Sequence, residues 1–203
     1  MSLIKLNDRA VKDVTQFGSI SSLGSLTHIS TATASSSASI EFTSGIDSTY
    51  KEYVFYYHSI HPQTNLAEFQ FNLSTDGGSN YNVTKTTTFF RAYHYETSGE
   101  GIGYVGGKDL AQSTSDQLFT DDGISSDNDS CLVGSLTLYN PSSSVFVKHF
   151  ISNNNFMTDN GGYLTMNTNV AGYGNTVNPI DAVKFQMSSG NIDDGIIKMY
   201  GVS

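Results

Sequence analysis

Apolar and polar residues alternate at every second position through most of the chain after its first fifth. The clearest segment is 67–73, in which the apolar residues Ala67, Phe69, Phe71 and Leu73 alternate with polar ones. A period of two places the apolar side chains on one face of a β-strand. Residues 74–79 then supply serine, aspartate and two glycines, which suit a tight reversal. We therefore expect a half-buried strand, a turn and a returning strand over about 81–95.

Further segments show the same alternation less clearly. They are 38–42, 52–59, 132–139, 145–151, 163–171, 183–187 and 195–202. Most large aromatic residues fall within them and are expected in the core, whereas Thr165, Asn167 and Asn169 form a polar face. Eight or nine short strands separated by turn residues predict an all-β fold, an antiparallel β-sandwich or a barrel, of which we favour the sandwich.

The N-terminal segment, residues 1–29, follows another pattern. Apolar residues recur there every three or four positions, as on one face of a short helix: Leu3, Leu6, Ala10, Val14 and Phe17. A short isolated helix is marginal in water, so we expect an arm that docks on its own domain or on another subunit. Residues 30–37 are small and polar and predict a linker, which leaves 38–203 as the sandwich domain.

Composition narrows the classes of function. The chain has 203 residues, of which 10 are basic and 19 acidic, giving a formal net charge of −9. Nucleic-acid binding through a basic surface is therefore not expected. A single cysteine excludes an intrachain disulfide framework, and no apolar run is long enough for membrane insertion. The first residues lack the apolar core of a signal peptide, so we expect folding in a reducing cytoplasm.

Residues 109–129 form an acidic stretch with six aspartates and no lysine or arginine. We expect a long surface loop there, and loops of this length are often functional. Hard oxygen ligands suit Ca²⁺, and the candidates for it are Asp121, Asp122, Asp127 and Asp129. The EF-hand pattern is absent, and the favoured alternative is a solvated acidic loop that keeps the protein soluble.

Patterns typical of enzymes are absent from the sequence. There is no G-x-S-x-G, no H-E-x-x-H and no Walker spacing, and the five histidines do not follow metal-ligand spacing. The glycine-rich residues 99–107 are expected to form a hairpin tip. Glycoside hydrolysis would need two carboxylates across a cleft, and the sequence identifies no such pair. We therefore expect a protein that is not an enzyme.

Two segments resemble jelly-roll structural proteins of tailed bacteriophages, especially those of marine and cyanobacterial podophages. Residues 69–81, Phe-Gln-Phe-Asn-Leu-Ser-Thr-Asp-Gly-Gly-Ser-Asn-Tyr, are similar to their hairpin of a strand, S-x-D-G-G-S and tyrosine. Residues 189–202 are similar to their closing G-x-I-x-x-G-x-I-x-x-Y-G hairpin. The opening Leu3-Ile4-Lys5-Leu6 resembles virion proteins that hook onto a neighbour. The resemblance implies a jelly roll over about 38–203.

The resemblance also implies a role in the virion, as a head decoration, tail appendage or fibre subunit assembled in the host cytoplasm. The implied partners are other capsid or tail proteins and two further copies of the chain in a homotrimer. The residues expected to anchor the arm are Leu3, Ile4, Leu6, Val14 and Phe17. The alternative is a module that binds host surface glycans, with Ca²⁺ held by the acidic stretch.

Overall fold

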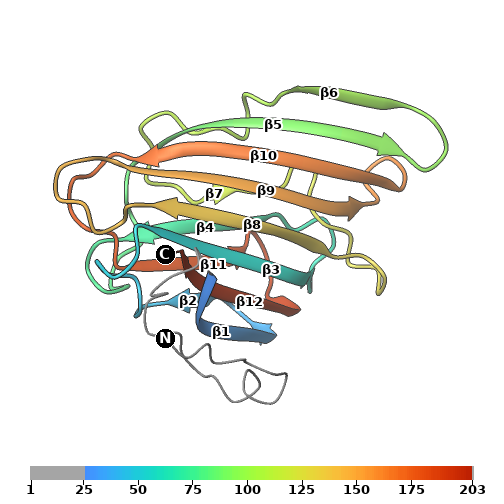
Figure 1. Ribbon diagram of the computed structural model, residues 1–203. Helices are drawn as coiled ribbons and strands as arrows, with labels where there is room; N and C mark the ends of the chain where they lie inside the picture. Colours follow the sequence, from blue (N-terminus) through green and yellow to red (C-terminus); the bar gives the residue numbers. More distant parts are fainter. Residues whose placement is uncertain (1–25, 203) are drawn as a thin grey trace, which may run out of the picture.

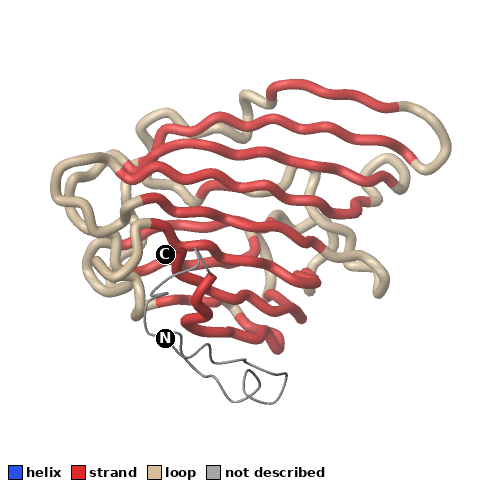
Figure 2. Tube along the Cα trace, viewed as in Figure 1, coloured by secondary structure: helices blue, strands red, loops and turns tan. Residues whose placement is uncertain are grey.

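The structure, a computed structural model, describes residues 26–202, and these form strands and loops without a helix (Figure 2). It contains the twelve strands β1 (Leu26–Ser37), β2 (Ile40–Phe42), β3 (Glu52–Pro62), β4 (Phe69–Ser74), β5 (Lys85–Tyr95), β6 (Glu100–Tyr104), β7 (Gln117–Leu118), β8 (Leu132–Tyr139), β9 (Lys148–Thr158), β10 (Leu164–Gly174), β11 (Ala182–Met187) and β12 (Ile192–Val202). The predicted all-β class is confirmed, with more strands than the eight or nine expected. The described part therefore offers no helix that would cross a membrane.

The strands form two antiparallel sheets. The large sheet has eight strands in the order β1-β12-β3-β8-β9-β10-β5-β6, which lie side by side in Figure 1. The small sheet has four strands in the order β2-β11-β4-β7. The predicted antiparallel β-sandwich is thus confirmed. Strands β1 and β6 form the two edges of the large sheet.

The hydrophobic core lies between the sheets and is rich in aromatic rings. Tyr53, Phe55 and Tyr57 of β3 are buried, as the sequence predicted, because they share the inner face of that strand. Phe71 of β4 stacks on Phe119 with ring centroids 4.8 Å apart. Rings of this size exclude water from a large area, and their packing holds the two layers together.

Residues 30–37 are part of a strand, so the linker predicted there is wrong. They belong to β1, which pairs with β12 from Leu26 opposite Val202 to Ser37 opposite Ile192. The sheet therefore begins at least twelve residues before the predicted boundary at residue 38. The reason is that β1 is an edge strand with mostly exposed side chains. Because few of its side chains are buried, such a strand can consist mainly of small polar residues.

Strands β4 and β5 are not neighbours, although the sequence predicted them as a hairpin. Strand β4 lies in the small sheet and β5 in the large one, so the turn carries the chain from one layer to the other. Within this turn Asp76 Oδ1 accepts a hydrogen bond of 2.8 Å from the backbone amide of Asn80. Alternation along a strand identifies its buried face, but it does not identify the strand's partner.

The glycine-rich hairpin tip predicted at residues 99–107 is also different in the structure. Its first part forms β6, which pairs with β5 from Glu100 opposite His94 to Tyr104 opposite Phe90. Glycine is tolerated at 101 and 103 because β6 is a mostly exposed edge strand, and at 101 the ring of Tyr93 leaves little room for a Cβ atom.

Candidate functional site

The acidic stretch 109–129 is partly built into the core, which corrects the prediction of a surface loop. Phe119 and Ile124 are fully buried. The backbone amide of Leu66 donates a 2.9 Å hydrogen bond to the carbonyl oxygen of Ile124, and β7 pairs with β4. At the end of the stretch Asp127 and Asp129 are exposed, whereas Asp121 is buried and Asp122 is half-buried. In the sequence, the presence of Phe119 and Ile124 within the acidic stretch could have indicated that part of it is buried.

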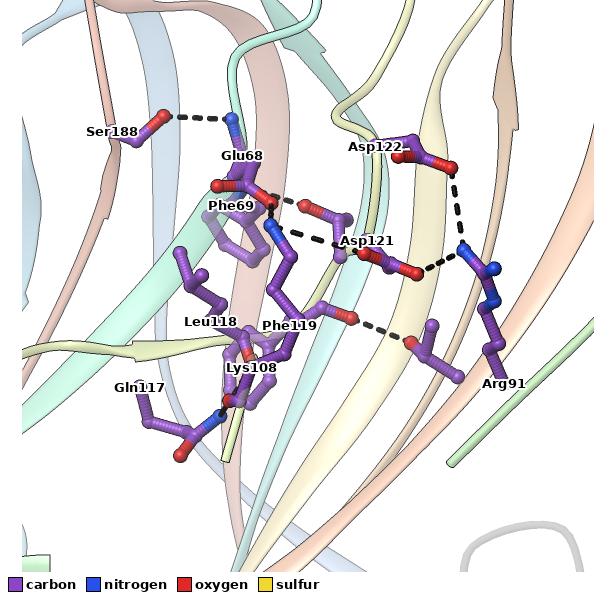
Figure 3. A network of polar contacts seen from close by, with 12 residues as sticks. Glu68, Phe69, Arg91, Lys108, Gln117, Leu118, Phe119, Asp121, Asp122 and Ser188 are labelled. Carbon is purple, nitrogen blue, oxygen red and sulfur yellow. Dashed lines mark hydrogen bonds and ion pairs between the residues drawn. The ribbon is translucent and has the colours of Figure 1, made fainter. Parts of the chain in front are cut away.

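The first two candidate calcium ligands belong to an ion-pair network (Figure 3). Asp121 pairs with Arg91 of β5 through Oδ2, and its Oδ1 lies 3.8 Å from Nζ of Lys108. Arg91 Nη1 is also 3.3 Å from Asp122 Oδ2, and Lys108 pairs with Glu68. The side chain of Asp121 is only 5% exposed. Two cations of the protein therefore already balance its charge.

The other two candidates lie elsewhere. Asp127 accepts a 3.1 Å hydrogen bond from the hydroxyl of Tyr163, and this bond raises the pKa of that tyrosine. Asp129 lines a surface hollow of about 330 Å³ together with His61 and Asp193, whose Nδ1 and Oδ2 atoms are 3.6 Å apart. Within residues 26–202 no three His, Cys, Asp or Glu side chains are placed to hold a metal ion. The four aspartates thus do not form one set of ligands.

The outer face of the large sheet, turned away from the core, is the other candidate surface. Cross-strand pairing aligns Phe90 of β5 with Asn169 of β10 and Asn153 of β9 on this face. These three residues are exposed, as are Ile151 and Ile102. The described chain therefore leaves a broad surface open that carries both amide and apolar groups.

This surface is almost free of charge. At the outward positions of β8, β9, β10, β5 and β6, Glu100 is the only Asp, Glu, Lys or Arg, although the chain has 29 such residues. The remaining titratable groups on this face besides tyrosines are His94 and His149, and His94 Nε2 lies 3.9 Å from Glu100 Oε2. A surface without charges can bind an uncharged partner without the cost of desolvating ions.

The sequence indicated only part of this surface. It placed Thr165, Asn167 and Asn169 on one polar face, and the structure confirms that they share the outer side of β10. It did not single out Asn153 or the neighbouring Asn155. The run of three asparagines at 153–155, flanked by alternating residues, was the available signal.

The residues predicted to anchor an N-terminal arm lie outside the described residues; they are Leu3, Ile4, Leu6, Val14 and Phe17. Comparison of the chain with models of protein families, with curated proteins and with solved structures finds no match. Functional conclusions therefore depend on the sequence and the geometry alone.

Proposed function

We propose that residues 26–202 form a jelly roll with two insertions. Without the hairpins β5-β6 and β9-β10, eight strands remain, in the sheets β1-β12-β3-β8 and β2-β11-β4-β7. Along the chain these strands alternate between the two sheets, with β4 and β7 as the only consecutive pair in one sheet. A double sheet of eight strands built from two such interleaved Greek keys is the jelly-roll arrangement. The two hairpins widen one sheet and leave this order intact.

We further propose that the protein is a non-enzymatic structural component of a bacteriophage virion, either a head decoration or a tail appendage or fibre subunit. The observation that carries this proposal is the strand order, because viral capsid proteins are prominent among jelly rolls. The similarity of residues 69–81 and 189–202 to phage structural proteins adds to it. In this role the jelly roll is displayed outward and residues 1–25 attach it to the particle.

Deletion of residues 1–20 tests the role in the virion. Because β1 begins at Leu26, the truncated chain retains every described strand and should fold. We expect the full chain to be found in purified particles and the truncated chain to be absent from them. A double variant of exposed residues in the described part, Val145→Ser with Val177→Ser, serves as the control that should still assemble. Full incorporation of the truncated chain would contradict the proposed anchor.

Recognition of a host surface glycan is the second candidate function. The observation that favours it is the nearly uncharged outer face of β8, β9, β10, β5 and β6, rather than the acidic stretch. If Ca²⁺ at the acidic stretch assisted recognition, a chelator and Asp127→Ala would both abolish glycan binding. Binding that survives both changes would exclude Ca²⁺ at the acidic stretch from recognition and favour the sheet.

A further inference from the structure

We infer that the outer face of β9, β10 and β5 is a binding site for an uncharged polysaccharide. The inference refines the second candidate function and does not require the protein to be part of a virion. It depends on three features that lie next to each other on this face: a ring of asparagine amides, two hollows beside it and an exposed aromatic pair.

The centre of the site is a closed ring of three side-chain amides, which we call the amide ring. Asn153 donates from Nδ2 to Oδ1 of Asn169 at 2.7 Å, and Asn169 donates to Oδ1 of Asn167 at 3.0 Å. Asn167 closes the ring with a 3.4 Å hydrogen bond to Oδ1 of Asn153. Asn167 Nδ2 also donates to the backbone carbonyl oxygen of Asn154 at 2.8 Å, so both of its hydrogens are used. Each amide oxygen of the ring has a second lone pair, and the amide nitrogens of Asn153 and Asn169 each have a second hydrogen, so these atoms keep hydrogen-bonding capacity for a ligand. The ring also fixes the rotamers before a ligand binds, which lowers the entropic cost of binding.

A hollow of about 500 Å³ lies on one side of the amide ring along the strands. Its floor includes Ala171 of β10, whose small side chain is flanked by Thr88 and Ile151 in the neighbouring strands. The next row of the same hollow contains Tyr173 and His149, whose ring centroids are 6.0 Å apart. Hydroxyl groups beside apolar and aromatic surfaces match the two kinds of surface on a sugar ring.

A second hollow, of about 270 Å³, lies on the other side of the amide ring. Its floor includes Ala92 of β5, and its lining includes Asn167 of the ring itself together with Asn155 and Thr165. Asn155 is held in place by a 3.1 Å hydrogen bond to the hydroxyl of Thr165. The two hollows and the ring between them form a path along the strands, which suits an extended chain of repeating units.

An aromatic pair borders the path on the side of β6. Phe90 aligns with Asn169 of the ring and contacts Tyr104 edge to face, with centroids 5.1 Å apart. Both rings are about half exposed. The hydroxyl of Tyr104 donates to Asp109, which holds this ring in place. An exposed and fixed aromatic surface can pack against the apolar C–H face of a sugar at little entropic cost.

The scarcity of charged side chains on this face favours an uncharged ligand over an anionic polymer. An anionic polymer would find neither lysine nor arginine at the outward positions of these strands, in a protein of net charge −9. A protein partner would meet a surface whose centre is amide rather than apolar, unlike the aromatic and apolar centres of most protein interfaces. Uncharged sugars, which offer hydroxyl groups and apolar faces, match the amides, threonines and rings found here.

A glycan array probed with the full chain, followed by calorimetry on the strongest ligand, tests the inference. We expect binding to neutral oligosaccharides and not to sulfated or uronic ones, with little change in high salt. Phe90→Ala and Asn169→Ala should each weaken binding by about tenfold or more, since Asn169 belongs to the amide ring and Phe90 borders the path next to it. Phe146→Ala is the matched control, because Phe146 is also an exposed phenylalanine but lies in the loop between β8 and β9. It should bind as the unchanged protein does.

An array without any neutral ligand would overturn the inference, and so would equal binding by Phe90→Ala and the unchanged protein. If Phe90→Ala instead altered the number of copies in the assembly without affecting glycans, the face would be an interface between copies. None of these outcomes bears on whether the chain is present in virions, which the deletion of residues 1–20 tests separately.

Discussion

Arg91 joins the acidic stretch to the large sheet through charge, in addition to backbone hydrogen bonds such as those between Lys85 and Ser113. Its guanidinium pairs with the nearly buried carboxylate of Asp121 and lies 5.2 Å from the centroid of the Tyr93 ring. Without it, Asp121 would keep only Lys108 as a cationic neighbour. Removal of one partner from a largely buried pair leaves a charge without compensation, which is strongly destabilising.

We expect Arg91→Met to lower the free energy of unfolding by about 3 kcal/mol. Lys51→Met serves as the control, because Lys51 is exposed, and should change it by less than about 0.5 kcal/mol. Urea unfolding at neutral pH measures both. Equal stabilities of the two variants would show that the ion-pair network contributes little.

Lys85 is a buried amine on the inner face of β5. Its Nζ donates to Oδ1 of Asn72 at 2.5 Å and to the carbonyl oxygen of Val83 at 2.9 Å. Burial lowers the pKa of Lys85 from 10.5 to about 8. Between these two values the unfolded chain binds more protons than the folded one, so this group makes the protein more stable as pH rises.

The pH dependence of stability tests this assignment. From pH 7.5 to 9.5 we expect the protein to gain about 2 kcal/mol relative to Lys85→Met, which lacks the titrating amine. The quantity compared is the change between the two pH values within each protein, so any general loss of stability in the variant cancels. Parallel curves for the two proteins would contradict the lowered pKa of Lys85.

At the scale of elements, the acidic stretch packs against the turn before β4 through a close approach of two backbones. Gly123 has a φ of +76°, and a Cβ atom there would lie 2.1 Å from the carbonyl oxygen of Leu66. Gly77 has a similar φ of +70° but open space around it. Alanine at Gly77 would therefore suffer backbone strain alone, whereas alanine at Gly123 would suffer the same strain and a steric clash as well.

We expect Gly77→Ala to cost about 1 kcal/mol, which is the penalty for a left-handed conformation alone. Gly123→Ala should cost more than about 3 kcal/mol, because Leu66 and the turn that contains it must also move. Thermal unfolding of both variants measures the difference. Similar losses would mean that the stretch is free to shift away from β4.

The sequence predicted buried faces of strands well and neighbouring strands poorly. Alternation identified β4 and the inner face of β3, because burial of every second side chain is a local property. It could not identify that β4 and β5 belong to different sheets, since partners are chosen by packing of the whole molecule. Strand β1 was missed because an exposed edge strand carries almost no apolar pattern. The amide ring was missed because its members come from two strands.

At the scale of the whole molecule, the proposed role in a virion implies assembly with other copies. We expect a homotrimer, whose mass would be three times that of the 22.0 kDa chain. Light scattering coupled to size-exclusion chromatography measures this mass. A monomer at all concentrations would remove the homotrimer from the proposal, while other virion proteins would remain as partners.

Reconstruction of the phage particle by electron cryomicroscopy is the most direct test of the proposed function. We expect density for the two sheets on the outside of the particle, with residues 1–25 directed toward the capsid or tail. The outer face of β9, β10 and β5 should point away from the particle, where a glycan can reach it. Particles that contain no such subunit, or that bury this face against the capsid, would contradict the proposed role.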